Sequence, residues 1–216
     1  SHDAFLTVSA ITANECKYLL GREPDGITPN GFENDFVWTG EEYDAKRAEA
    51  RTAMISVAEA CLGHKFRKEA LIVGTSGRYE FRNKGIDIFL DALKQLAETD
   101  ALDREVLLYI TVPSATTGPR KDLQAHLADE NSPIDPKQNR FCTHYLEHPE
   151  WDQILNSIAG SVLANPSSKV KVVFVPTYLN GRDGIFDKSY YELLVGMDMT
   201  LFPSYYEPWG YTPLES

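Results

Sequence analysis

The chain has 216 residues, of which 43% are hydrophobic and 25% are charged, and its formal net charge is −11. This composition is typical of a globular protein of one or two domains, and so acidic a surface repels phosphate backbones, which disfavours nucleic-acid binding. Neither an apolar run long enough to cross a membrane nor a secretory signal pattern is visible, so we expect a cytoplasmic protein without a membrane partner.

The N-terminal part of the chain predicts short elements followed by one long helix. Residues 5–9 (FLTVS) are apolar and β-branched, which favours a strand, and residues 12–20 form a candidate helix. The Pro-Asp-Gly run at 24–26 predicts a turn, and the proline and glycine near residues 27–31 indicate a strand end or a connector. Residues 41–62, rich in alanine and charged helix formers, predict the longest helix.

From residue 70 the chain alternates short apolar runs with helical patterns. Predicted strands cover residues 70–74, 106–112, 170–176 and 199–203, and predicted helices cover residues 84–98, 151–163 and 189–196. The segment 113–149 is polar and irregular, with one helix near residues 121–129. Because parallel strands need crossover connections, this alternation predicts an α/β fold with a Rossmann-like, doubly wound parallel sheet.

Ligands of such sheets bind outside the carboxyl ends of the strands, so we expect the chemistry in the loops that follow them. The first of these loops carries Gly77, Arg78 and Lys84. Glycine lets the backbone approach a ligand, and a helix N-terminus near Lys84 would offer N–H groups to an anion. Arg78 and Lys84 would add two cations to a pyrophosphate pocket. A tight turn with solvent-exposed cations is the alternative.

The last loop, residues 204–212, carries Glu207, and a second glutamate, Glu215, follows the loop in the chain. Thr212 is placed to cap a helix that begins at Pro213, which would let both carboxylates face one ligand. Carboxylates bind sugar hydroxyls and stabilise an oxocarbenium-like transition state, although two spaced glutamates also occur on ordinary solvated surfaces. The loop also gathers aromatic and proline residues that suit sugar or base packing, or an aromatic plug, namely Tyr205, Tyr206, Pro208, Trp209 and Tyr211.

Cysteine and histidine spacing gives no support for a metal site. The cysteines Cys16, Cys61 and Cys142 are far apart, so we expect free, buried thiols rather than disulfides. His144 and His148 have the spacing of helical metal ligands, but no H-E-x-x-H pattern accompanies them. We therefore expect these two histidines in a solvent-facing loop.

Four segments in order carry a resemblance that spans the chain. They are TVSAITA from Thr7, KYLLGREPDGITPNG from Lys17, GRYEFRNKGID from Gly77 and FPSYYEPWGYTPLE from Phe202. Together they resemble the glycogen synthases of the animal and fungal type, which also occur in some bacteria. That resemblance implies a GT-B glycosyltransferase, with residues 1–31 as the tail of the N-terminal lobe, 32–69 as a helical connector and 70–216 as most of the nucleotide-sugar-binding C-terminal lobe.

The resemblance also implies an activity and its residues. The complete protein would move glucose from UDP-glucose, or ADP-glucose, to the 4-hydroxyl of an α-1,4-glucan end with retention, using no metal or other cofactor. Arg78 and Lys84 match cations on the diphosphate, Glu207 lies near the transferred glucose, Glu215 contacts ribose or sugar hydroxyls, and Tyr190 stacks on uracil. Further sugar or phosphate contacts are expected from Gly77, Trp209, Gly210, Tyr211 and Thr212.

Several alternatives stay open at this point. Other GT-B transferases, of the sucrose or trehalose-phosphate type, also carry two glutamates at this spacing. A non-catalytic nucleotide- or glucan-binding module and an interaction-only protein are further alternatives. The helix at 41–62 could serve a homo-oligomer interface or pack along its own domain. Because the first-lobe catalytic region is not in this sequence, we expect the chain alone to be inactive.

Overall fold

A parallel β-sheet forms the centre of the computed structural model, which describes residues 3–34, 37–66, 70–99 and 101–216. Its four strands run in the order β7–β4–β3–β8. Their bounds are β3 Leu71–Ser76, β4 Val106–Thr111, β7 Val170–Phe174 and β8 Met199–Thr200. The predicted strands are confirmed, although the last one is two residues long rather than five.

Strand β3 lies between β4 and β8 and runs parallel to both. It pairs with β4 from Leu71↔Val106 to Ser76↔Thr111. Its other edge pairs with β8 only at Val73↔Met199 and at Gly74↔Thr200. The carboxyl ends of all these strands therefore open onto one edge of the sheet.

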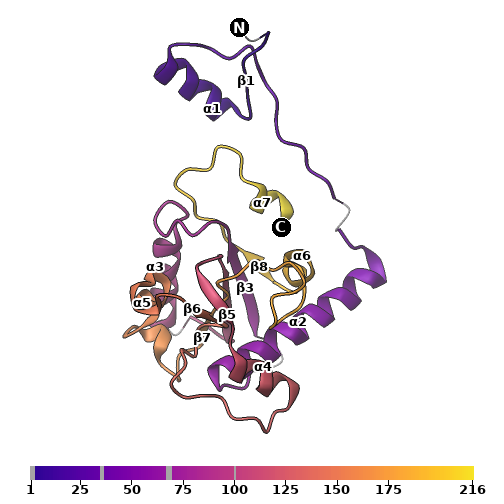
Figure 1. Cartoon of the computed structure of the whole chain (residues 1–216), viewed down its shortest axis with the longest axis vertical. Helices are drawn as coiled ribbons and strands as arrows, with labels where there is room; N and C mark the ends of the chain where they lie inside the picture. The colour runs from indigo at the N-terminus through magenta and orange to yellow at the C-terminus, as the bar shows by residue number, and fades with distance from the viewer. Residues whose placement is uncertain (1–2, 35–36, 67–69, 100) are drawn as a thin grey trace.

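Helices cover both faces of the sheet, as the doubly wound prediction requires. Helices α3 (Ile86–Ala97) and α5 (Gln153–Ile158) lie on one face, and α2 (Gly40–Leu62) and α6 (Tyr190–Leu194) lie on the other (Figure 1). Neighbouring strand residues alternate between two hydrophobic clusters, because side chains of a strand point to opposite faces. Buried residues on the α3 side include Phe89, Leu90, Val73, Leu108 and Val172. Buried residues on the α2 side include Met54, Val57, Ile72, Leu107 and Val173.

A charged clamp attaches helix α2 to the sheet edge. The Asp198 carboxylate, just before β8, pairs with Arg47 and with Arg51, whose Nη1 lies 2.8 Å from Oδ2. The same carboxylate accepts the backbone N–H of Ile72 in β3 at 2.8 Å. Burial alone would raise the pKa of Asp198, but these hydrogen bonds and cations outweigh it and lower the pKa.

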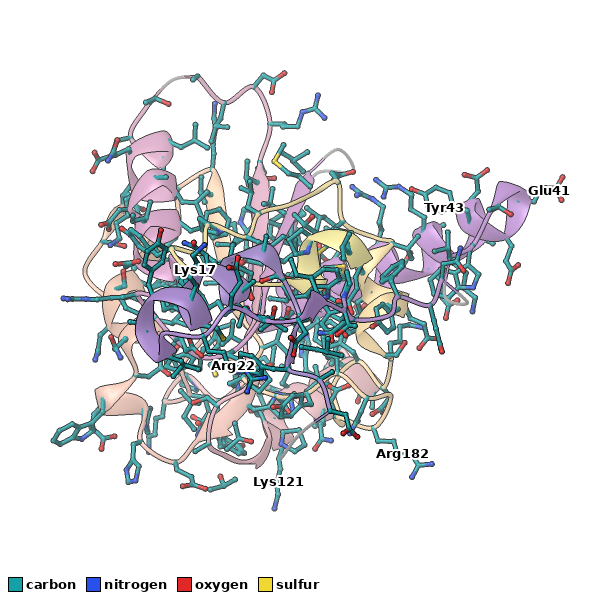
Figure 2. All side chains as sticks on the ribbon, turned by 90° about the horizontal axis from the view of Figure 1, so that it is seen from above. Lys17, Arg22, Glu41, Tyr43, Lys121 and Arg182 are labelled. Carbon is teal, nitrogen blue, oxygen red and sulfur yellow. The ribbon has the colours of Figure 1, made fainter. Side chains whose placement is uncertain are left out.

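The two halves of α2 differ in burial. Its buried residues begin at Ala50, near the middle of the helix, and continue through its C-terminal half. Gly196 lies against this half, where an added Cβ would be 2.8 Å from the Ala50 Cβ. The other end of the helix, with Glu41 and Tyr43, extends away from the sheet (Figure 2). Residues 35–36 and 67–69 of the predicted connector lie outside the described residues.

The N-terminal segment forms a small unit of its own, apart from the sheet (Figure 1). Strands β1 (Leu6–Thr7) and β2 (Gly26–Ile27) pair in parallel, and α1 (Ala10–Glu15) continues into a π-helical turn, η1 (Cys16–Leu20). The helix predicted at 12–20 thus begins earlier, because the Ser9 side chain accepts the Thr12 N–H and caps it. The Tyr206 hydroxyl donates to Glu15 Oε2 at 2.7 Å and joins this unit to the last loop.

The segment 113–149 holds more structure than predicted. Helix α4 (Lys121–Ala128) confirms the helix expected there, but β5 (Thr116–Pro119) and β6 (His144–Leu146) form an unpredicted antiparallel pair. The expectation that His144 faces solvent is wrong, because its side chain is buried and its Nε2 lies 3.0 Å from the Asp183 carbonyl. Burial lowers the pKa of His144.

Beyond β6 the predicted helix at 151–163 is interrupted. A 3₁₀ turn, η2 (Pro149–Trp151), precedes α5, and a second, η3 (Val162–Ala164), follows it. Helix α5 ends at Ile158, because Ala159 already leaves the helical conformation with a ψ of 132°, and Gly160 follows with a φ of +72°.

All three cysteines are free thiols, and two of them are buried as predicted. Cys61 and Cys142 are buried, which raises the pKa of each thiol to about 12, whereas Cys16 is half-buried. Across the described residues, no group of His, Cys, Asp and Glu side chains is arranged to hold a metal ion. None of the helices built from those residues is both long and apolar enough to span a bilayer.

We expect Asp198→Asn to lower the free energy of unfolding at pH 7 by about 1–2 kcal/mol, because the variant loses the charge that Arg47 and Arg51 face. Because the folded-state pKa of Asp198 is lowered, its contribution is complete above the unfolded pKa of about 3.9 and fades as the pH falls below it.

Urea unfolding of both proteins between pH 7 and pH 3 measures this difference. Asp91→Asn, which removes an exposed partner of Lys94, is the control and should change stability little. A difference between Asp198→Asn and the parent that stays constant down to pH 3 would contradict the assignment.

Candidate functional site

The candidate site is built from the loops that follow β3 and β8. Because these strands are parallel neighbours, the loop from Gly77 to Gly85 and the loop from Leu201 to Gly210 leave the same edge of the sheet. In Figure 1 the second of these loops passes beside the first on its way to α7 (Tyr211–Glu215). Two motifs that are distant in the sequence therefore meet in space.

A backbone contact joins the two loops. The Tyr205 N–H donates to the Asn83 carbonyl at 2.8 Å. Next to it, Gly85 has a φ of +64°, and a Cβ added there would lie 2.0 Å from the Pro203 carbonyl oxygen. Only glycine accommodates both this backbone conformation and this close approach.

An ion pair is the central feature of the site. The Lys84 ammonium pairs with the Glu207 carboxylate, and the Ser204 hydroxyl donates to the same Oε2 at 3.3 Å. The side chains are largely withdrawn from water, at 17% exposed for Lys84 and 32% for Glu207. The structure thus brings together a cation from the first predicted motif and a carboxylate from the second.

Gly210 makes room for this carboxylate. Its φ is +69°, and a Cβ added there would lie 2.7 Å from Glu207 Cγ. Gly210 also occupies the N-cap position of α7, which begins at Tyr211. The prediction that Thr212 caps a helix beginning at Pro213 is therefore wrong, since no side chain caps this helix.

The other predicted cation, Arg78, follows Gly77, whose φ is +143°. The Arg78 side chain is exposed, and its guanidinium has no hydrogen-bond or ion-pair partner among the residues that the structure describes. Its backbone carbonyl accepts the Glu80 N–H at 2.8 Å, which tightens the turn. Of the two predicted cations, one is paired and the other projects freely from the loop.

The expectation of free helix N–H groups near Lys84 needs correction. Helix α3 begins at Ile86, and Lys84 lies in the turn before it. The Phe81 carbonyl already accepts the N–H groups of Ile86 and Asp87 at 3.0 and 3.3 Å, and the Lys84 N–H donates to Glu80. The turn folds back onto the start of the helix and provides acceptors for these N–H groups. An anion at this position would therefore interact with the Lys84 ammonium rather than with these N–H groups.

Tyr190 lies near the carboxyl end of β3, at the start of α6. A capping box between Ser189 and Glu192 sets the beginning of this helix. The Tyr190 hydroxyl lies 2.8 Å from Ser76 Oγ, and burial raises its pKa. Ser76 was not among the predicted site residues, although a polar residue that ends an apolar strand is a signal that could have found it.

Glu215 has a different partner from Glu207. It accepts the Tyr191 hydroxyl at 2.9 Å, and burial together with this carboxylate raises the Tyr191 pKa to about 12. Glu215 and Tyr191 line a hollow of about 340 Å³ together with Met199 and Leu214. The structure therefore holds Glu215 through a tyrosine and Glu207 through a lysine.

The aromatic residues of the last loop are not a solvent-excluding plug. Tyr205, Tyr206 and Tyr211 are exposed. Trp209 meets Tyr211 edge to face, with ring centroids 6.5 Å apart. Its indole Nε1 is buried and has no hydrogen-bond partner within the described part of the chain. The predicted sugar contacts of Trp209, Tyr211 and Thr212 stay predictions.

A larger hollow, of about 720 Å³, lies elsewhere. The C-terminal end of α2, helix α4 and the loop after it line this hollow, with Arg120 and Arg140 among the lining residues. Neither Lys84 nor Glu207 reaches it. Arg120 is fully buried, and its guanidinium is already bound to Asp122 and to two backbone carbonyls. Size alone therefore does not make this hollow the candidate site.

The doubly wound sheet with polar loops at its carboxyl edge defines the class of the fold as a Rossmann-like lobe. Comparison with known proteins narrows this class. The model of the family described as glycogen synthase matches residues 1–125 and 124–216, which together span the chain. The chain therefore belongs to the glycogen synthase family.

Individual relatives support the same assignment. The chain is 30% identical to "Glycogen [starch] synthase" of Neurospora crassa over 272 aligned positions, which cover 100% of the chain and 38% of that relative. It is 28% identical to "Glycogen [starch] synthase isoform 2" of Saccharomyces cerevisiae, covering 100% of the chain and 39% of the relative. The corresponding values for the human liver enzyme, "Glycogen [starch] synthase, liver", are 28%, 98% and 38%.

The chain thus spans about two fifths of the length of the curated relatives that it matches. The Neurospora alignment needs 272 positions for 216 residues, so that relative carries residues that this chain lacks. The family match also divides at residues 124–125, inside α4.

We expect Gly85→Ala to destabilise the chain more than Gly63→Ala. Both glycines have a positive φ, near +64° and +62°, so each alanine carries similar backbone strain. Nothing lies within 4 Å of a Cβ at Gly63, whereas a Cβ at Gly85 meets the Pro203 carbonyl. The extra cost should be at least about 1 kcal/mol.

Urea unfolding at pH 7 compares the two variants. Equal losses in the free energy of unfolding would contradict a tight contact between the two loops.

Proposed function

We propose that the protein containing this chain is a retaining glucosyltransferase of the glycogen synthase type, transferring glucose from UDP-glucose to the 4-hydroxyl of an α-1,4-glucan end. The observation that carries this proposal is the meeting of Lys84 and Glu207 at the carboxyl edge of the sheet. Family membership and the names of the relatives supply the reaction.

The loop after β3 suits the diphosphate of the donor. Arg78 is exposed, Lys84 is close to it in the chain, and Gly77 keeps the backbone free of a side chain at the turn. In transfer, the bond between the glucose C1 and the phosphate oxygen breaks, and negative charge builds on the leaving nucleoside diphosphate. The two cations would stabilise that charge more in the transition state than in the bound donor.

The loop after β8 suits the transferred sugar. As C1 loses its leaving group it becomes oxocarbenium-like, and a carboxylate near it stabilises the positive charge. Glu207 is close to the proposed diphosphate cations, because it is paired with Lys84 itself. Glu215, held by the Tyr191 hydroxyl, would contact ribose or sugar hydroxyls.

Tyr190 would receive the base of the nucleotide. Its ring stands near the end of β3, with the hydroxyl tied to Ser76, so the ring is held in place before a ligand arrives. A fixed aromatic face costs little entropy when a base stacks on it. Stacking alone accepts uracil and adenine, so the choice between UDP-glucose and ADP-glucose has to be measured.

We expect the complete protein to transfer glucose to glycogen and Glu207→Ala to lower kcat by at least about a hundredfold, the usual cost of losing one electrostatic stabiliser of a transition state. Initial rates with UDP-glucose and with ADP-glucose measure this and identify the donor. Glu150→Ala, at an exposed carboxylate in η2, is the control and should keep the parental rate.

The acceptor is tested in the same experiment. Transfer to free hexose or hexose phosphate in preference to glycogen would move the assignment to another GT-B transferase. Nucleotide binding without any transfer by the complete protein would leave a non-catalytic module. The 216-residue chain alone is expected to bind nucleotide and to transfer nothing, and glucan elongation by it would contradict that expectation.

For the base, we expect Tyr190→Ala to weaken UDP binding about tenfold, the usual worth of one stacked base, and Tyr190→Phe to change it far less. The phenylalanine keeps the stacking face and loses only the hydroxyl that meets Ser76. Isothermal titration calorimetry of UDP gives the comparison. Equal losses in the two variants would place the base elsewhere.

A further inference from the structure

The two cations of the proposed diphosphate site are in different states. The Arg78 guanidinium is exposed and has no partner within the described residues, whereas the Lys84 ammonium is already neutralised by Glu207. A lysine ammonium is a compact charge, and its partners compete for it. A diphosphate that binds at Lys84 must therefore compete with the carboxylate that is there already.

The surroundings of Glu207 allow its carboxylate to separate from Lys84 and still keep a hydrogen-bond partner. The Ser204 hydroxyl donates to the same carboxylate oxygen, so Glu207 keeps one polar partner when Lys84 leaves. Because Gly210 has no Cβ, nothing at this position collides with the Glu207 Cγ, which would lie 2.7 Å from such a Cβ. The contact between the Tyr205 N–H and the Asn83 carbonyl still holds the two loops together, because it does not involve either charged side chain.

We propose that Glu207 is the resident counter-ion of the diphosphate site: the nucleotide diphosphate displaces Glu207 from Lys84, and this exchange frees the carboxylate to face the donor sugar. The inference rests on the proposed function and adds a coupling to it. Arg78 meets the incoming phosphate first, and Lys84 then changes partner. The exchange makes and breaks ion pairs only, with no covalent step and no net transfer of a proton.

This coupling has a measurable consequence. While Lys84 is held by Glu207, only a fraction of the molecules offers a free ammonium, and the apparent affinity for a diphosphate is reduced by that fraction. Removing the charge of Glu207 should therefore strengthen diphosphate binding, even though it should slow the transfer of glucose. An ordinary substrate-binding carboxylate would behave in the opposite way.

The test is UDP binding to the 216-residue chain and to Glu207→Gln by isothermal titration calorimetry, with uridine as the second probe. Glutamine keeps the size and the acceptor for Ser204 but not the charge. We expect UDP to bind Glu207→Gln about tenfold more tightly, which corresponds to a competent fraction of about a tenth in the parent. Uridine, which has no phosphate, should bind both proteins equally.

A matched control removes the same charge from the same region. Glu80 lies in the loop after β3, and its carboxylate accepts a hydrogen bond from the Asn83 side chain rather than from the Lys84 ammonium. Glu80→Gln keeps an acceptor for Asn83, and we expect less than about a twofold change in UDP affinity, since an unpaired charge acts mainly through a screened field. If Glu80→Gln raised the UDP affinity as much as Glu207→Gln does, the effect would come from the loss of any nearby negative charge, and the proposal would be overturned.

Lys84→Gln distinguishes the remaining outcomes. In that background Glu207→Gln should bring no gain, because the ammonium for which the anions compete is gone. A gain that persists there overturns the counter-ion role. If the parent binds UDP and Glu207→Gln does not bind it more tightly, the counter-ion proposal is overturned but the proposed donor site is not. If neither protein binds UDP, the counter-ion proposal and the proposed donor site are both overturned. If Glu207→Gln does not fold, Glu207→Asp, with a shorter reach to Lys84, takes its place with a smaller gain expected.

Discussion

The site depends on one constraint, the position of β3 between two parallel neighbours. Pairing at Val73↔Met199 and Gly74↔Thr200 brings the end of β8 beside the end of β3. Gly74 permits this, because a Cβ there would lie 2.1 Å from the Met197 sulfur, which occupies that space. Residues more than a hundred positions apart in the sequence thereby leave the sheet side by side. The Lys84–Glu207 pair is a consequence of strand register.

The same edge strand also secures the long helix. Asp198 precedes β8 and binds Ile72 of β3 together with Arg47 and Arg51 of α2. Because the pairing between β3 and β8 is only two residues long, this carboxylate holds the start of β8 in place where the backbone ladder is short. The loop that carries Glu207 begins directly after this anchored strand. The contacts that Asp198 makes and the position of Glu207 are therefore linked, because only a few residues separate them in the chain.

The sequence predicted what local pattern and strand order determine. Apolar runs predicted the central strands, and the placement of Arg78, Lys84 and Glu207 in loops at the carboxyl edge followed from the parallel topology. The errors arose where contacts outside the apolar spacing decide. The buried His144 contacts the Asp183 carbonyl, which lies 39 positions away in the chain. Helix α3 starts at Ile86 because the Phe81 carbonyl accepts the Ile86 N–H and folds the preceding turn back onto the helix, a local contact that the apolar spacing does not report.

Under the proposed function, a chain with a formal net charge of −11 would have to bind an anionic donor without binding every other anion equally well. A lysine left free at the edge of the sheet would attract any phosphate, whereas a lysine already paired with Glu207 presents almost no net charge. A free phosphate that binds Lys84 would then gain only the interaction with the ammonium that Glu207 loses. A nucleotide bound as proposed would add the stacking of its base on Tyr190 and the interaction with the exposed Arg78. The proposed pairing of Lys84 with Glu207 would thus favour the complete ligand, because only the complete ligand offsets the cost of separating the pair.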